Sequence, residues 1–167
     1  MPSNLNGCYD IWSNPHDEPS WATHSFLYNF VIVHKGNIWA QCLEVSLMEN
    51  TQNPFFPFQQ LNFLSSTGLQ CYNAGSCGAA ATHATAPSLP ETYQYPADPI
   101  MQFIGGMAGA TVNAFEQWYI PLAGGQWNVN TKRGVKTNNG IVPAEGALIA
   151  YGPAYGNPAN GTVMYEG

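Results

Sequence analysis

Charged side chains are scarce in this sequence. Asp, Glu, Lys and Arg make up 8% of its 167 residues, whereas an ordinary soluble protein carries about 25%. Solubility must therefore come from Asn, Gln, Ser and Thr side chains and from loops rich in Gly and Pro. We expect a compact chain with so little charge to be a domain that works outside the cell or on its surface.

Basic residues are the rarer of the two charged types. Four Lys and Arg stand against ten Asp and Glu, which gives a formal net charge of −6. Three of the four cations lie close together, at Lys132, Arg133 and Lys136. Nucleic-acid binding depends on a basic surface that neutralises many phosphates. The sequence therefore excludes a nucleic acid as the partner.

Long apolar runs are also missing. Asn, His or Gly interrupts the longest apolar stretches, and none approaches the roughly 18 consecutive apolar residues of a membrane-spanning helix. Residues 1–10 do not have the pattern of a signal peptide, so we expect any such segment to have been removed or to lie outside this chain. We find no internal repeat and predict no cofactor.

Apolar and aromatic side chains, in contrast, are plentiful. Hydrophobic residues make up 45% of the chain and aromatic residues 13%, a composition that excludes disorder as the ground state. A chain of this length fits one domain and buries roughly two-thirds of its unfolded surface on folding. We therefore expect a single domain spanning residues 1–167.

The first third of the chain alternates between strand and helix patterns. Short β-type runs lie at residues 8–12 and 37–41. Apolar residues at helical spacing predict a helix over 20–34, which ends at Gly36, and a second helix over 43–49. This order predicts parallel strands joined by right-handed crossovers. We therefore predict an α/β fold, with a largely parallel sheet flanked by helices on both faces.

The rest of the chain carries many more turn signals. Residues 52–99 hold many of the prolines, and we predict a long loop-rich excursion there with one strand at 60–64. Gly-rich turns separate short strands in the final third. These strands are predicted at residues 127–130, 135–137, 147–151 and 162–165. Residues 114–119 fit a short helix or a strand.

Four segments resemble one known superfamily. Residues 30–42 (FVIVHKGNIWAQC) are similar to a segment in which a helix, a glycine and a strand lead into a sharp elbow. Residues 98–105 (DPIMQFIG) resemble a loop that contains Pro-Ile, residues 116–119 (EQWY) a Glu-Trp-Tyr segment, and residues 160–167 (NGTVMYEG) a late Gly-x-Val-x-Tyr strand. Together they resemble the ThuA-like and class I glutamine amidotransferase-like superfamily. The resemblance implies a flavodoxin-like sheet, and such domains occur in large secreted bacterial surface proteins.

Two features depart from that superfamily's pattern. The histidine expected after its late strand would follow Gly167, and its early strands would precede Met1, so we expect a fragment or an abridged domain. In addition, Ala40 and Glu44 stand where the superfamily's elbow has glycines. Fold resemblance is in any case a poor guide to function.

Cys42 is the candidate nucleophile. It follows a predicted strand and opens a predicted helix, and a helix N-terminus lowers the pKa of a thiol. The superfamily's elbow position maps to Cys42 or to Gln41. A buried structural cysteine fits the same place, because cysteine is among the most buried residue types.

Other residues suggest a disulfide and a metal site. Cys71 and Cys77 flank a turn-rich segment, which fits a disulfide in a secreted chain, and two unpaired loop thiols are the alternative. His16 and Asp17 follow a predicted strand and are the candidate metal ligands, although helix capping also accounts for Asp17. Residues 160–162 (NGT) match a glycosylation sequon.

The candidate binding residues are tyrosines in Pro- and Gly-rich stretches: Tyr93, Tyr95, Tyr151 and Tyr155. Exposed aromatic side chains stack on sugars and pack against protein partners. We therefore predict a non-catalytic extracellular or cell-surface domain that binds other protein subunits or glycans and that self-associates or docks into a larger assembly. The alternative is a hydrolase or amidotransferase-like enzyme that uses Cys42.

Overall fold

The computed structural model describes residues 10–13, 24–52, 61–71, 88–104, 111–113, 118–137 and 144–167. Within these ranges the strands form a seven-stranded sheet and a two-stranded sheet. The large sheet contains β1 (Ile11–Ser13), β2 (Asn37–Gln41), β4 (Ser88–Tyr93), β5 (Thr111–Asn113), β7 (Lys132–Thr137), β8 (Ile149–Pro153) and β9 (Thr162–Glu166). The small sheet pairs β3 (Leu69–Cys71) with β6 (Tyr119–Pro121).

The helical elements are short. The helix α1 (His24–Tyr28) continues as the π-helix η1 (Asn29–Val33), and the 3-10 helix η2 (Cys42–Glu44) leads into α2 (Val45–Met48). The remaining two are α3 (Pro99–Ile104) and the 3-10 turn η3 (Ala154–Gly156). Among the described residues, no helix has the length and apolar character needed to cross a membrane.

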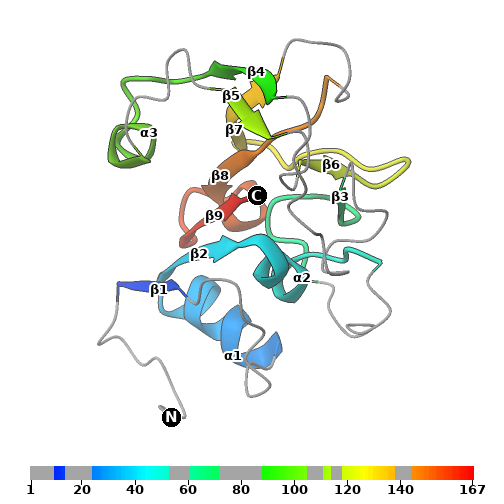
Figure 1. Ribbon diagram of the computed structural model, residues 1–167. Coiled ribbons are helices and arrows are strands. Elements are labelled where there is room, and N and C mark those ends of the chain that lie inside the picture. Colours follow the sequence, from blue (N-terminus) through cyan, green and yellow to red (C-terminus); the bar gives the residue numbers. More distant parts are fainter. Residues whose placement is uncertain are drawn as a thin grey trace.

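The large sheet is mixed rather than largely parallel. Its strand order is β1-β2-β9-β8-β7-β4-β5, with β9 between β2 and β8 (Figure 1). The strands β1, β2 and β9 pair in parallel, whereas each pairing from β9 through β8, β7 and β4 to β5 is antiparallel. The predicted α/β fold with a largely parallel sheet flanked by helices is therefore wrong. Only the parallel pairing of the first two strands is confirmed.

The connection between β8 and β9 explains this error. Residues 154–161 alone join the two strands, whereas a parallel crossover needs about a dozen residues or more. The chain therefore turns back at η3 and pairs antiparallel. Between β7 and β9 the described residues contain no helix other than this turn, so helices do not alternate with strands there.

The middle of the chain contains more regular structure than predicted. The excursion predicted over 52–99 holds β3, β4 and the start of α3. Residues 61–64, which were predicted as part of a strand, contain no strand, and residues 63 and 64 form a bend. The predicted strand at 127–130 is reduced to a single bridge between Trp127 and Ser65, followed by a turn. Of residues 114–119, those at 114–117 lie outside the described part of the chain.

The first helix ends where the sequence predicts, but a different residue adopts the left-handed conformation. Lys35 has a φ of 60°, whereas this conformation was expected at Gly36. Glycine is needed at position 36 for a different reason. A Cβ there would lie 2.2 Å from the ring of Phe30, so no larger residue fits. The missing side chain lets η1 pack closely against the start of β2.

Alternate residues of the central strands face two separate cores. One core, covered by α1 and α2, contains Leu27, Phe30, Ile38, Ala40, Val45, Val163 and Tyr165. The other core contains Met101 of α3 with Val135, Ile149, Tyr151 and Met164, and Trp39 packs against it. The helix α3 thus covers the second face beside β7 and β8. Over β1, β2 and β9, the same face is covered by less of the described chain than it is over β7 and β8.

Candidate functional site

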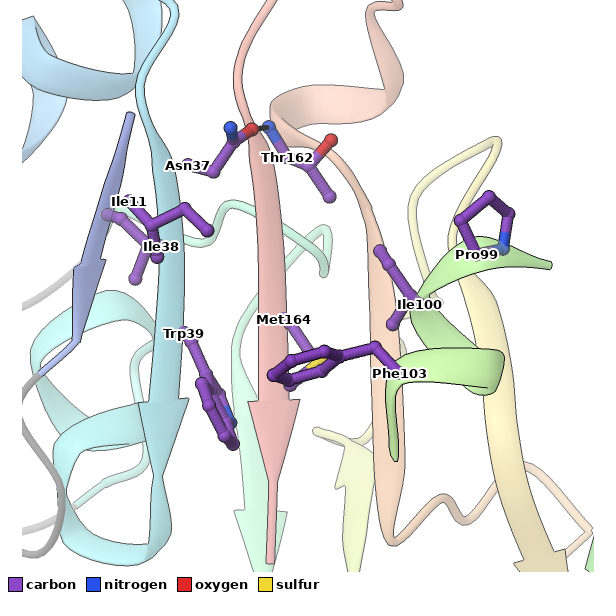
Figure 2. Close-up of a pocket in the computed structure, with 9 residues that line it drawn as sticks. All are labelled: Ile11, Asn37, Ile38, Trp39, Pro99, Ile100, Phe103, Thr162 and Met164. Carbon is purple, nitrogen blue, oxygen red and sulfur yellow. Dashed lines mark hydrogen bonds between the residues drawn. The ribbon is translucent and has the colours of Figure 1, made fainter. Parts of the chain in front are cut away.

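An apolar groove lies on the open part of the second sheet face (Figure 2). The strand β1 forms one side at Ile11, and α3 forms the other side with Ile100 and Phe103. Trp39 and Met164 form the floor between them. We call this site the β1–α3 groove. Its other lining residues are Asn37, Ile38, Pro99 and Thr162.

The size and exposure of the groove are those of a contact site. Its volume is about 540 Å³, and ligand pockets commonly measure about 300–1,000 Å³. Two large apolar side chains project from its opposite sides, since Ile11 is 63% exposed and Phe103 is 73% exposed. Clustered apolar groups that face solvent mark places where another molecule binds.

A capping carboxylate fixes the start of α3. The side chain of Asp98 accepts a hydrogen bond from the N–H of Ile100 at 3.1 Å, and Pro99 occupies the first helical position, where its missing N–H costs nothing. Asp98 also forms an ion pair with Lys132 of β7. Partial burial disfavours the charged form of Asp98, but the hydrogen bonds from Lys132 and Ile100 outweigh this effect and lower its pKa.

Two further contacts hold α3 against the sheet. The hydroxyl of Tyr93 donates a hydrogen bond to the carbonyl of Met101. The side chain of Met101 packs onto β7 at Gly134, where a Cβ would come within 2.4 Å of its sulfur. These contacts anchor the inner side of α3 and leave Phe103 directed into the groove (Figure 2).

The side-chain amide of Asn37 and the indole N–H of Trp39, both at the groove, are engaged within the protein. The Asn37 amide donates to the carbonyl of Asp10 at 3.0 Å and accepts the N–H of Thr162 at 2.8 Å. The indole N–H of Trp39 donates to the carboxylate of Glu166 at 3.0 Å. The groove therefore offers a ligand mainly apolar surface and the face of an aromatic ring.

Comparisons with known protein families, curated proteins and solved structures gave no match to this chain. The resemblance to the amidotransferase-like superfamily therefore stays a prediction. The function of the chain has to be inferred from the geometry and chemistry of its sites.

The structure brings three of the four candidate tyrosines together. Lys132 lies 5.6 Å from the ring centre of Tyr95 and 5.8 Å from that of Tyr151, and Tyr93 anchors α3 nearby. Tyr151 was expected in an exposed loop, but it lies in β8 and is 3% exposed. Its burial, together with the Asp98 carboxylate, raises its pKa. The side chains of Tyr93 and Tyr151 therefore support α3 rather than face a ligand.

Tyr155 lies apart from this cluster. Its ring packs against Phe63 and Tyr28, with centroid distances of 5.5 and 6.5 Å. Burial, reinforced by the charges of Tyr28 and Glu49, raises its pKa to about 12. With 40% of the residue exposed, Tyr155 is partly accessible, but it does not contribute to the β1–α3 groove.

Cys42 lies at a sharp junction between strand and helix. It directly follows β2 and opens η2, and its φ of 52° is left-handed. A non-glycine residue in this conformation costs roughly 1–3 kcal/mol, and such strain concentrates at functional sites. The residue is nevertheless only 6% exposed, and the hydroxyl of Tyr119 donates to its carbonyl at 2.9 Å.

Cys42 shares its surroundings with acidic side chains and with the phenol of Tyr119. Burial raises the pKa of Tyr119 well above its usual value, and the charges of Cys42, Glu166 and Glu44 add to this rise. Glu44 is fully buried and accepts the N–H of Gln41 at 3.3 Å. A nucleophilic thiol must be accessible to its substrate, and the burial of Cys42 limits that access.

A second hollow lies near the fully buried Glu49. The carboxylate of Glu49 accepts hydrogen bonds from the N–H of Leu64 and the hydroxyl of Tyr165, each at 2.7 Å, and from the hydroxyl of Ser65. Burial raises its pKa to about 7 against the opposing effect of these bonds. Asn128, which lines the hollow, donates its amide to the Phe63 carbonyl. We therefore assign this network to holding loop 61–68 rather than to ligand binding.

The remaining site predictions are not decided by the structure. His16, Asp17 and Cys77 lie outside the described residues, so the metal site and the Cys71–Cys77 disulfide stay predictions. In the described ranges, no three His, Cys, Asp or Glu side chains gather so that they could hold a metal ion. Asn160 lies in a turn, where its amide donates to the carbonyl of Ala154 at 3.0 Å.

The sequence prediction missed the main residues of the groove. Residues 98–105 were interpreted only as a loop of a known superfamily. A local signal for α3 was present, because an Asp-Pro pair opens many helices and apolar residues follow at Ile100, Phe103 and Ile104 with helical spacing. No local signal placed Ile11 across from this helix, since that arrangement depends on the sheet order.

Proposed function

We propose that this protein is a non-catalytic docking module that binds an apolar protein surface in the β1–α3 groove. The observation that supports it best is the pair of solvent-exposed apolar side chains, Ile11 and Phe103, on opposite sides of an apolar floor. We include in the proposal a location outside the cell or on its surface, which the low charge of the chain supports.

The chemistry of the groove favours a protein over a glycan. Sugar binding needs several polar groups that converge on the hydroxyls of the ligand. In the groove, both ends of the Asn37 amide and the N–H of Trp39 are used by Asp10, Thr162 and Glu166. An apolar segment of a protein needs none of these bonds and gains free energy by covering the exposed rings, at about 25 cal/mol per Å² of apolar surface.

A displayed library of random peptides, paired with a glycan array, tests this proposal. We expect the protein to enrich peptides with two or more large apolar residues and to leave the glycans unbound. Binding of an enriched peptide, measured by fluorescence anisotropy, should weaken at least tenfold in Phe103→Asp, because the variant places a carboxylate in the apolar groove. Val129→Asp is the matched control, since Val129 is 71% exposed and lies outside the groove.

Two results would contradict the docking function. One is glycan binding without peptide enrichment, which would favour the sugar-binding alternative. The other is peptide binding that Phe103→Asp and Val129→Asp weaken equally, which would place the contact elsewhere on the protein.

A thiol-dependent enzyme is the second candidate function. The observation in its favour is the left-handed φ of 52° at Cys42, between β2 and η2, since a strained turn of this kind presents the nucleophile in many hydrolases. Its burial favours a structural role instead. Alkylation of the native protein distinguishes the two, because a buried structural thiol should react only after unfolding.

A further inference from the structure

We propose that the apolar partner of the β1–α3 groove is a second copy of this chain, bound so that α3 of each copy fills the groove of the other. This inference rests on the proposed docking function and makes it specific. It follows from the arrangement of the groove, from its charge and from the number of residues that it offers.

The groove and the helix that would fill it belong to the same surface. Phe103 and Ile11 lie on opposite sides of the groove (Figure 2), and their side chains are 73% and 63% exposed. A two-fold interface requires a self-complementary patch in which residue i of one copy contacts residue j of the other, and the reverse. Adjacent projection and hollow on one face meet this requirement.

The geometry of the sheet defines the symmetry axis. The strands β2 and β9 run parallel along the floor of the groove, with β1 on one side and α3 on the other. A two-fold axis that runs parallel to these strands, above the floor, exchanges the two sides. It brings α3 of each copy opposite β1 of the other, so that Phe103 of one copy faces Ile11 and Trp39 of its partner.

The charge of the groove is compatible with a second copy. None of the described residues that line the groove is charged, so two chains that each carry a net charge of −6 would meet there without placing like charges against each other. The groove provides no charge pattern that would select a basic or acidic partner.

The extent of the patch predicts a weak dimer. A standard interface uses about 20–30 residues on each side and buries roughly 800 Å² per partner. The groove lining accounts for fewer residues than that, even with the flanking edge of β1. We therefore expect a dissociation constant on the order of 1–100 µM.

Analytical ultracentrifugation between about 1 and 200 µM tests the dimer, because this range spans the expected dissociation constant. Wild type should pass from monomer to dimer, and Phe103→Asp should raise the dissociation constant at least tenfold. Val129→Asp should behave as wild type. Circular dichroism of both variants checks that each is folded, which is expected because both positions are exposed.

Photo-crosslinking identifies the faces that meet. A benzoylphenylalanine residue at position 103 should crosslink to the β1 or β2 peptides of the other copy. Mixing ¹⁴N and ¹⁵N protein distinguishes crosslinks between copies from those within one copy. The same residue placed at position 129 should give no crosslink between copies at this face.

The outcomes separate this inference from the function on which it rests. A strict monomer that still enriches groove-directed peptides overturns the dimer and leaves the docking function standing. A dimer that is unaffected by Phe103→Asp, or that crosslinks elsewhere, also overturns the inference. A monomer that enriches no groove-directed peptide overturns both.

Discussion

The indole ring of Trp39 and the phenyl ring of Phe103 meet edge to face, with centroids 5.8 Å apart and planes inclined at 85°. This contact joins β2 to α3 across the floor of the groove. Aromatic pairs in this geometry contribute roughly 0.5–1.5 kcal/mol beyond the burial of their surface. The position of α3 therefore determines the shape of the groove, and changes at the anchors of α3 should affect binding.

Asp98→Asn tests this dependence. The variant removes the ion pair with Lys132 but keeps a side-chain oxygen that can cap Ile100, so we expect it to lower the free energy of unfolding by about 0.5–1 kcal/mol and to weaken dimerisation. Urea unfolding and ultracentrifugation measure the two effects. Glu145→Gln is the control, since Glu145 is exposed and is not a lining residue of the groove, and it should change neither. Unchanged dimerisation in Asp98→Asn would show that this anchor does not support the groove.

The stabilising effect of Asp98 should also depend on pH. Its pKa is lower in the folded protein than its ordinary value of 3.8, so ionised Asp98 stabilises the fold above that value and this contribution is lost as the pH falls through the folded pKa. The difference in stability between wild type and Asp98→Asn should therefore be present at neutral pH and shrink below about pH 4.

Glu49 should produce the opposite pH dependence. Burial raises its pKa from 4.5 to about 7 in the folded protein, so the folded state binds more protons than the unfolded state between these values. Its contribution to stability should thus be greatest below about pH 4.5 and fall as the pH rises to 7. At about 1.4 kcal/mol for each pKa unit, the loss is roughly 3 kcal/mol.

Urea unfolding of wild type and Glu49→Gln at several pH values measures this effect. The Gln variant removes the titrating group and should abolish the fall in stability between pH 4.5 and 7 that we attribute to Glu49. Glu145→Gln is the matched control, since Glu145 is exposed, and its curve should follow wild type. If Glu49 instead stabilised the fold more strongly as the pH rose, its carboxylate would be ionised at a low pKa in the folded protein.

Cys42 should react slowly in the native protein. Because the residue is only 6% exposed, an alkylating reagent cannot reach its thiol in the folded protein. We therefore expect iodoacetamide at pH 6.5 to label it only after unfolding. Cys42→Ser should fold with somewhat lower stability and keep the same dimer affinity. Rapid, selective alkylation of native protein would support the thiol-dependent enzyme instead.

The Cys71–Cys77 disulfide is a further prediction from the sequence. Mass spectrometry of protein that has been alkylated without reduction should find a peptide pair linked through these two residues. Full labelling of both thiols would exclude the bond.

The sequence predicted local elements better than their arrangement. The strand predicted at 37–41 coincides with β2, and the strands predicted at 135–137, 147–151 and 162–165 overlap β7, β8 and β9. Each of these strands is predicted from the alternation of its side chains, and that alternation involves only residues that are neighbours in the sequence. The direction of pairing depends on the connection lengths, and residues 154–161 were long enough for a turn but too short for a crossover.

The candidate site was less predictable for a related reason. Trp39, Ile100 and Met164 are far apart in the sequence and meet only because β9 inserts between β2 and β8. Loop composition pointed to Tyr151 as an exposed ligand contact, yet β8 buries it. The exposed aromatic residue at the groove is Phe103, whereas the sequence prediction named four tyrosines.

The most direct test of the docking groove is NMR of ¹³C-labelled methionine methyl groups. Met164 lies on the groove floor, whereas Met48 of α2 is fully buried in the other core, so Met48 serves as an internal reference. Met164→Leu and Met48→Leu assign the two signals. On raising the protein concentration or adding an enriched apolar peptide, the Met164 signal should shift and the Met48 signal should stay in place. Binding that leaves the Met164 signal unmoved would contradict the account.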